Sequence, residues 1–146
     1  MKYSWGSHPN IKCNELELKS SSNLKNTILD TEEFIIHGNG RSYGDSGINK
    51  TIVKSIDYNS VISFNEEEGV LEAQSGILLE DILKIIVPKG WFLKVTPGSK
   101  YITLGGAIAS DVHGKNHHID GCFSESVLSF NLMLSDGRIE HCKKRD

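Results

Sequence analysis

Glycine is concentrated in two stretches of this chain, and they constrain its fold more than any other feature of the sequence. The first covers residues 38–47 (GNGRSYGDSG) and directly follows the apolar residues 34–37 (FIIH). The second runs from Pro97 to Gly121 and contains the small-residue segment 105–110 (GGAIAS). Glycine permits positive φ and lets another group approach the backbone closely. We therefore expect two functional loops on a scaffold of short helices and strands.

The segments around these loops predict a mixed scaffold. A Ser-rich start predicts a helix over Ser20–Asp30, and apolar residues at helical spacing that stop at Pro88 predict another over 78–86. Short β-branched runs predict strands at 34–37, 51–56, 61–64 and 70–74, and an Asp-Gly turn predicts a hairpin of residues 126–135 and 138–142. Residues 7–20 show no clear pattern, and 97–121 is expected to be irregular. This order predicts one α+β domain over residues 1–146, without the regular βαβα alternation of a Rossmann fold.

Charge and composition exclude several classes of protein. Lys and Arg number 16 against 19 Asp and Glu, a net charge of −3, whereas nucleic-acid-binding domains are normally basic. We therefore expect no nucleic-acid partner. No apolar run is long enough to span a membrane, and the N-terminus lacks the apolar core of a signal peptide. Three cysteines without CxxC spacing argue against a disulfide scaffold and favour a cytoplasmic protein.

The first glycine-rich stretch has the composition of an anion-binding loop. Its glycines allow backbone N–H groups to turn inward around a phosphate, while Arg41 and Ser42 offer a charge and a hydroxyl. The segment is neither a P-loop, because no Gly-Lys-Ser/Thr follows, nor a GxGxxG turn that opens a long helix. From the residues alone, a phosphate-binding loop and an ordinary surface turn both remain open.

The second stretch allows several interpretations. Its small residues suit either close approach of a flat ligand or packing of a helix on a sheet. His113 and His117, with Asp111 and Cys122 nearby, raise the hypothesis of a metal site. Gly114 interrupts the helix that this spacing requires, and no HExxH glutamate accompanies the pair, so we expect no metal. A polar loop that presents His113 and Lys115 to a ligand is favoured instead.

Together, the two stretches resemble the FAD-binding domain of the PCMH-type, or vanillyl-alcohol-oxidase, flavoprotein family, and within it the oxidases of lipid-linked ribose and of sugar lactones. The resemblance rests on residues 38–45 (GNGRSYGD), Pro97-Gly98, 103–107 (TLGGA) and 111–118 (DVHGKNHH). Trp5-Gly6 and residues 135–137 (SDG) match as well, so it covers nearly the whole chain. It implies the first subdomain of that domain and the start of the second, truncated after Asp146.

The resemblance implies FAD as the cofactor. In the family the first loop surrounds the FAD pyrophosphate, and the second passes along the isoalloxazine ring. The implied cofactor-binding residues are Gly38, Asn39, Gly40, Arg41, Ser42, Tyr43, Gly44, Asp45, Gly98, Thr103, Leu104, Gly105, Gly106, Ser110, Asp111 and His113. The implied catalytic candidates are His113, Lys115 and Tyr43. Members with covalent FAD often carry His where this chain has Arg41, so non-covalent FAD is expected.

The resemblance also implies an oxidoreductase that acts on the CH–OH group of a small-molecule or lipid-linked sugar. A cap domain supplies much of the family's substrate site, so this chain is expected to be inactive alone and to need the rest of its polypeptide or a complementary chain. Peripheral membrane association of a longer parent is compatible with this assignment. The alternative is a non-catalytic nucleotide-binding or interaction module.

Overall fold

The computed structural model describes residues 2–144. The strands are β1 (Lys2–Tyr3), β2 (Asn10–Ile11), β3 (Asn14–Glu17), β4 (Ile35–His37), β5 (Thr51–Lys54), β6 (Val61–Asn65), β7 (Val70–Ala73), β8 (Ser129–Met133) and β9 (Ile139–Lys143). The helices are α1 (Ser21–Asp30), α2 (Leu79–Ile86), α3 (Leu104–Ala109) and α4 (His117–Asp120), with 3₁₀ turns η1 (Val87–Lys89) and η2 (Phe123–Ser126). No helix in the described part of the chain is long and apolar enough to cross a membrane.

The first half of the chain forms a parallel three-stranded sheet in the order β3-β5-β4. Helix α1 connects β3 to β4 and begins where the predicted cap lies, because the Ser20 side chain accepts a hydrogen bond from the Asn23 N–H. The central strand β5 is the most deeply buried, with Ile52 and Val53 fully enclosed. A strand that is covered on both faces is a rigid support for the loop that precedes it.

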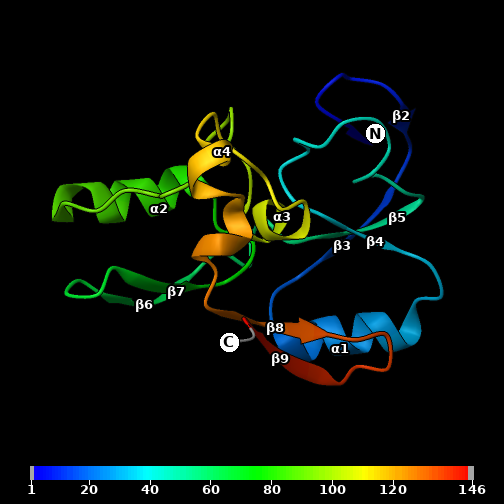
Figure 1. Ribbon diagram of the computed structural model, residues 1–146. Coiled ribbons are helices and arrows are strands. Elements are labelled where there is room, and N and C mark those ends of the chain that lie inside the picture. The colour runs from blue at the N-terminus through cyan, green and yellow to red at the C-terminus, as the bar shows by residue number, and fades with distance from the viewer. Residues whose placement is uncertain (1, 145–146) are drawn as a thin grey trace.

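The second half packs around the amphipathic helix α2. Its buried side chains join residues from the segments before and after it in one apolar core: Ile77, Leu79, Ile82, Ile86, Val95, Ala107 and Phe123. The helix ends in η1, and Gly90 caps it with a φ of 83°. Beside it lies the antiparallel β6–β7 hairpin. Figure 1 shows α2 and this hairpin at one end of the molecule, the parallel sheet at the other, and α3 and α4 between them.

The β8–β9 hairpin leaves apolar side chains in solvent. Phe130 and Leu132 on β8 are exposed, as is Ile139 on β9. The hairpin lies along α1 in Figure 1, and its turn touches that helix, since a Cβ on Gly137 would lie 3.0 Å from Cγ of Lys25. Asp136 and Gly137 sit in the turn as predicted, but only Gly137 has positive φ. The turn is therefore a longer loop of residues 135–137, not a two-residue type I′ turn.

The predicted helices, strands and hairpin are present, with ends that differ by a few residues. One expectation was wrong, and one segment without a prediction contains strands. Residues 97–121 are not irregular throughout, because α3 and α4 lie within them. Residues 7–20, for which the sequence predicts no element, include β2 and β3; the only alternation there is Leu16 in β3 and Leu18 just after it, between charged neighbours. Leu18 is buried, and its N–H donates to the carbonyl of Lys54 on the central strand, contacts that a weak local pattern does not reveal.

Candidate functional site

The first glycine-rich loop leaves the sheet at the end of β4 and returns to it before β5. Gly40 and Gly44 have φ of 63° and 57°, a left-handed conformation that strains any residue with a Cβ. The end of the loop is held by its own hydrogen bonds, from the Ile48 N–H to the Asp45 carbonyl (2.9 Å) and from Ser46 Oγ to the Tyr43 carbonyl (2.8 Å). The loop thus has a fixed shape that depends on glycine at two positions.

The backbone N–H groups of this loop are available as hydrogen-bond donors. Among residues 2–144, none of the N–H groups of residues 38–44 donates a hydrogen bond to a protein acceptor. Backbone N–H groups normally find a partner in the protein, in water or in a ligand. A run of such groups around left-handed residues forms the concave arrangement that binds anions. The structure therefore favours the anion-binding interpretation of this loop over an ordinary turn.

The second glycine-rich stretch meets the first loop directly. Asn39 donates from Nδ2 to the carbonyl of Tyr101 (2.8 Å). Gly38 lies so close to Thr103 that a Cβ at position 38 would be 2.7 Å from Thr103 Oγ1. Thr103 is itself buried and caps α3 by accepting from the Gly106 N–H. Two segments more than sixty residues apart in sequence are therefore joined into one site.

Arg41 holds a positive charge at this junction. Its guanidinium carbon lies 5.1 Å from the ring centroid of Trp5 and 6.0 Å from that of Tyr101, both within the range of a cation–π contact. The Trp5 N–H also donates to the carbonyl of Ser42 (3.1 Å). No carboxylate in the described residues forms an ion pair with Arg41. Sequence reasoning did not place Trp5 or Tyr101 in the site, because stacking between distant residues leaves no local pattern.

Helix α3 contributes less to anion binding than its small residues suggest. The N–H groups of Leu104 and Gly105 donate to the carbonyls of Ile77 (2.8 Å) and Ser75 (2.7 Å), and that of Gly106 donates to Thr103. Its first donors are therefore already used within the protein. Gly105 is small for a structural reason, because a Cβ there would lie 3.0 Å from the Ser75 side chain.

Two other glycines of the second stretch present open backbone. Gly98 has no neighbouring atom within 4 Å of the position of a Cβ, and Gly106 is exposed, with only Thr103 Oγ1 close to that position. Their backbone can be approached by a flat group without displacing a side chain. Ser110, also expected to bind the cofactor, is exposed at the end of α3.

The segment after α3 is anchored from two sides. Asp111 has a φ of 40°, and its carboxylate accepts a hydrogen bond from the Ser124 N–H (2.9 Å). His113 pairs with Cys122 in an isolated antiparallel bridge. Gly114 is buried, and a Cβ there would lie 2.8 Å from the carbonyl oxygen of Thr96. The backbone that carries His113 is thus fixed, although its side chain is exposed.

The catalytic candidates come from both loops. The His113 ring lies edge-on to the His117 ring at 5.2 Å, and its Nδ1 is 3.5 Å from the Gly114 carbonyl oxygen, too far for a strong hydrogen bond. Lys115 and Tyr43 are exposed, Tyr43 to 79%. Within residues 2–144, no hydrogen bond or ring contact joins Tyr43 to the other two.

The histidines of the second stretch do not form a metal centre. His113 precedes Gly114, and His117 begins α4, so the pair does not share a helix face. The described residues contain no group of three or more His, Cys, Asp or Glu side chains placed to hold a metal ion. The three cysteines are free.

An ion pair fixes the second stretch to α2. Lys100 Nζ lies 2.8 Å from Glu80 Oε1, and this hydrogen bond lowers the pKa of Glu80 and raises the pKa of Lys100. Backbone bonds reinforce the contact, from the Leu79 N–H to the Ile102 carbonyl (3.0 Å) and from the Glu80 N–H to the Lys100 carbonyl (2.9 Å). Helix α2 therefore determines where the second stretch passes the first loop.

Comparison with known proteins places these loops in a family. The sequence profile of the FAD binding domain matches residues 29–143. The chain is 35% identical over 109 residues to the decaprenylphosphoryl-beta-D-ribose oxidase of Mycolicibacterium smegmatis. This match covers 73% of the present chain and 24% of the oxidase. It is 30% identical over 81 residues to the D-lactate dehydrogenase of Anaerostipes hadrus, covering 56% of this chain and 17% of that enzyme.

A solved structure supports the fold. The crystal structure of 6-hydroxy-D-nicotine oxidase from Arthrobacter nicotinovorans matches 88% of this chain and 29% of its own chain, with a TM-score of 0.75 at 14% sequence identity. The present chain thus spans about a quarter of the curated oxidase that it matches and less of the dehydrogenase. Its two glycine-rich loops, their contact through Asn39 and Thr103, and the match over residues 29–143 lead to one conclusion: the chain belongs to the FAD-binding domain family of flavoproteins.

Proposed function

We propose that this chain is the cofactor-binding part of an FAD-dependent oxidoreductase that acts on a CH–OH group of a sugar. The observation that carries the proposal is the run of N–H groups at residues 38–44, beside Arg41, for which residues 2–144 offer no acceptor and no ion-pair partner. The relatives named above include a ribose oxidase and a D-lactate dehydrogenase. The ribose oxidase has the higher identity and the longer match, which favours a sugar over a hydroxy acid as the substrate.

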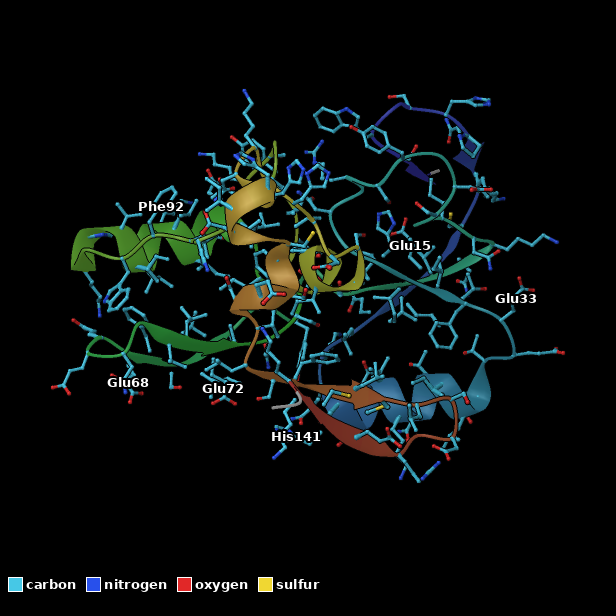
Figure 2. The ribbon with its side chains drawn as sticks, in the orientation of Figure 1. Glu15, Glu33, Glu68, Glu72, Phe92 and His141 are labelled. Atoms are coloured by element: carbon cyan, nitrogen blue, oxygen red, sulfur yellow. The ribbon has the colours of Figure 1, made fainter. Side chains whose placement is uncertain are left out.

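The first loop fits the pyrophosphate of FAD. A pyrophosphate carries negative charge and many acceptor oxygens, and the loop offers N–H donors together with a guanidinium. Figure 2 shows Glu68 and Glu72 on the β6–β7 hairpin, at the other end of the molecule from this loop, whereas Glu15 and Glu33 lie at the same end as the loop. Glu15 forms an ion pair with Lys54, and Glu33 accepts a hydrogen bond from Asn49. Asp45 lies in the loop, and its backbone carbonyl closes the final turn. We assign it to loop shape, not to phosphate contact.

The second stretch fits the flat part of the same cofactor. The open backbone at Gly98 and Gly106 permits close approach of a planar ring, and Thr103 brings that backbone next to the first loop. When bound, FAD supplies the acceptor for the hydride that leaves the substrate carbon. The protein then has to bind and orient both reactants and to hold a proton acceptor near the substrate hydroxyl.

We assign His113, Lys115 and Tyr43 to the side of the site where the substrate arrives. His113 has no strong hydrogen bond to its ring nitrogens among residues 2–144, so its imidazole is free to hold or move a proton. Lys115 forms no ion pair in the same part of the chain and offers an unopposed cation. Tyr43 offers a hydroxyl at the edge of the phosphate loop.

The proposed enzyme needs more protein than this chain. The exposed apolar residues Phe130, Leu132 and Ile139 lie on a hairpin that pairs with no other strand among those described. Such a hairpin is suited to cover by the remainder of a larger polypeptide or by a complementary chain. A sugar, free or lipid-linked, is the proposed substrate, and a cytoplasmic location remains part of the proposal.

The direct test is a titration of the purified chain with FAD. We expect quenching of the bound flavin's fluorescence to saturate with one FAD per chain, and added inorganic pyrophosphate to displace the cofactor. Acid precipitation should release all flavin to the supernatant, because Arg41 offers no nucleophile for a covalent bond. Absence of FAD binding by the chain, both alone and with the remainder of its polypeptide, would refute the proposal. Flavin that stays in the acid pellet would refute only the non-covalent assignment.

A further inference from the structure

His37 is a buried imidazole at the base of the first glycine-rich loop. It is the last residue of β4 and is only 6% exposed. Its Nδ1 lies 2.6 Å from the carbonyl oxygen of Gly47, at the opposite end of the loop. The His37 side chain therefore joins the two ends of the loop of residues 38–46, at positions 37 and 47.

The hydrogen bond fixes the protonation of His37 at one nitrogen. A carbonyl oxygen can only accept, so Nδ1 must carry the proton in this contact. The described residues include no buried side-chain nitrogen or oxygen without a partner. The other ring nitrogen, for which no protein partner is found, therefore retains contact with solvent. The imidazole thus acts at Nδ1 as a hydrogen-bond donor directed at the loop's closing end.

Both ends of this contact are held by further packing. The His37 carbonyl accepts from the N–H (3.0 Å) and the hydroxyl (3.3 Å) of Ser55, just after β5. At the other end, a Cβ on Gly47 would lie 2.6 Å from Ser42 Oγ and 4.0 Å from His37 Nδ1. Only glycine fits between these two side chains without displacing Ser42. The imidazole is consequently clamped between a rigid strand and the returning backbone of the loop.

We propose that His37 is a positioning residue for the anion loop, which it closes through its Nδ1–H bond to Gly47. The inference rests on the proposed function of that loop as a pyrophosphate site. Free N–H groups bind an anion tightly only if their arrangement exists before the anion arrives, because ordering a loop on binding weakens affinity. Within the loop itself, residues 38–44 make no backbone N–H bonds that could maintain this arrangement. The constraints come from outside: Asn39 and Ser42 are bonded to Tyr101 and Trp5, and the bond from His37 joins the two ends of the loop.

The first experiment needs no cofactor. Arg41 is exposed within the loop, so cleavage after it by trypsin reports how often the loop opens. We expect His37→Leu to accelerate this cleavage roughly tenfold relative to cleavage elsewhere, the effect of losing one hydrogen bond to a partly buried carbonyl. His37→Asn should restore protection, because an amide nitrogen in a similar place can donate to Gly47. Ile86→Ala, in the distant α2 core, is the control for a general loss of stability.

The second experiment measures affinity. We expect the FAD dissociation constant and the inhibition constant of inorganic pyrophosphate to rise together in His37→Leu, by about tenfold, to recover in His37→Asn, and to be unchanged in Ile86→Ala. Equal trypsin protection of the loop in the wild type and His37→Leu would overturn the role of His37 whether or not FAD binds. Opening of the loop in His37→Leu without any change in FAD and pyrophosphate affinity would also overturn it. Failure of the wild type to bind FAD would refute the proposed function instead, and the trypsin result would still decide whether His37 closes the loop.

Discussion

At the scale of single residues, the loop between β4 and β5 depends on backbone conformation more than on side chains. Gly40 sits at a φ of 63° in the middle of the free N–H groups. A side chain there both strains the backbone and occupies space next to donors that an anion must approach. A substitution at position 40 can therefore test cofactor binding separately from stability, if FAD affinity and melting temperature are both measured.

We expect Gly40→Val to eliminate FAD binding while lowering the melting temperature only modestly. Gly90 provides a matched control, because it also has positive φ (83°), has open space at its Cβ position, and lies at the end of η1 away from the loop. Gly90→Val should show a similar loss of stability, about 1–2 kcal/mol for a forced left-handed residue, with unchanged FAD affinity. FAD titrations and thermal melts of both variants make the comparison. An unchanged dissociation constant in Gly40→Val would contradict the pyrophosphate assignment.

The sequence revealed some residues of this site and concealed others. Gly40, Gly44 and Arg41 were predictable, because clustered glycines with a neighbouring cation are a local signal. The contacts of His37 and Tyr101 were not, because each depends on a partner brought close by folding: the Gly47 carbonyl for His37, and Asn39 and Arg41 for Tyr101. From the sequence, the small size of Gly105 could serve either ligand approach or packing of a helix. Its close contact with Ser75 shows that packing is one reason for the glycine.

At the scale of secondary-structure elements, helix α3 and its cap join the two loops. Thr103 Oγ1 accepts from the Gly106 N–H (3.2 Å), and the same oxygen faces Gly38. The cap is buried, so its loss is not compensated by water. A short, glycine-containing helix of low intrinsic stability is especially dependent on such a bond.

We expect Thr103→Val to destabilise the chain by about 1 kcal/mol or somewhat more, because it removes the capping oxygen with little change in shape. Thr103→Ser retains that oxygen and should remain close to the wild type. Urea unfolding monitored by circular dichroism measures both. If Thr103→Ser loses stability and Thr103→Val does not, packing of the methyl group, and not the cap, stabilises α3.

The contact between α2 and the second stretch makes a prediction about pH. Lys100 lowers the pKa of Glu80 below its ordinary value of 4.5. A carboxylate whose pKa is lower in the folded state stabilises that state above its unfolded pKa, and this contribution is lost as pH falls through the folded pKa. The melting temperature of the wild type should therefore exceed that of Glu80→Gln by a constant margin above about pH 5, and the margin should shrink towards pH 3.

Glu72→Gln is the control for this pH series. Glu72 is exposed on β7 and takes part in no ion pair with the described residues. The difference in melting temperature between Glu72→Gln and the wild type should therefore be nearly the same at every pH. A Glu80→Gln margin that persists at pH 3 would show that the carboxylate's charge does not stabilise this contact.

Elements differ in how well sequence predicts them. Helix α2 was clear, because its apolar spacing, Pro88 and Gly90 all indicate the same element and end point. Helix α3 was missed, because two glycines disfavour a helix. Contacts made in the fold stabilise it instead: its cap, the buried Ala107 and the backbone bonds of Leu104 and Gly105. Local propensity decides α2, whereas tertiary contacts decide α3.

At the scale of the whole molecule, the chain provides the two glycine-rich loops on a rigid support but little enclosure around them. The catalytic candidates Tyr43, His113 and Lys115 are all exposed. Catalysis by stabilisation of a transition state requires a pocket that fixes the reacting C–H bond and excludes water. The match covers 24% of the ribose oxidase, so roughly three quarters of that relative lies outside the part that this chain resembles.

We therefore expect the 146-residue chain to bind FAD without oxidising sugars at a useful rate. A base must lie within hydrogen-bond reach of the substrate hydroxyl while the carbon faces the acceptor, and an open surface with freely moving side chains holds neither arrangement. Dye reduction with sugar lactones and activated ribose substrates is the assay, with the chain alone and with the remaining polypeptide of a longer parent added. Turnover should require the added polypeptide and should fall in His113→Ala. Substrate-dependent turnover by the chain alone that His113→Ala eliminates would instead place the complete catalytic machinery within these residues.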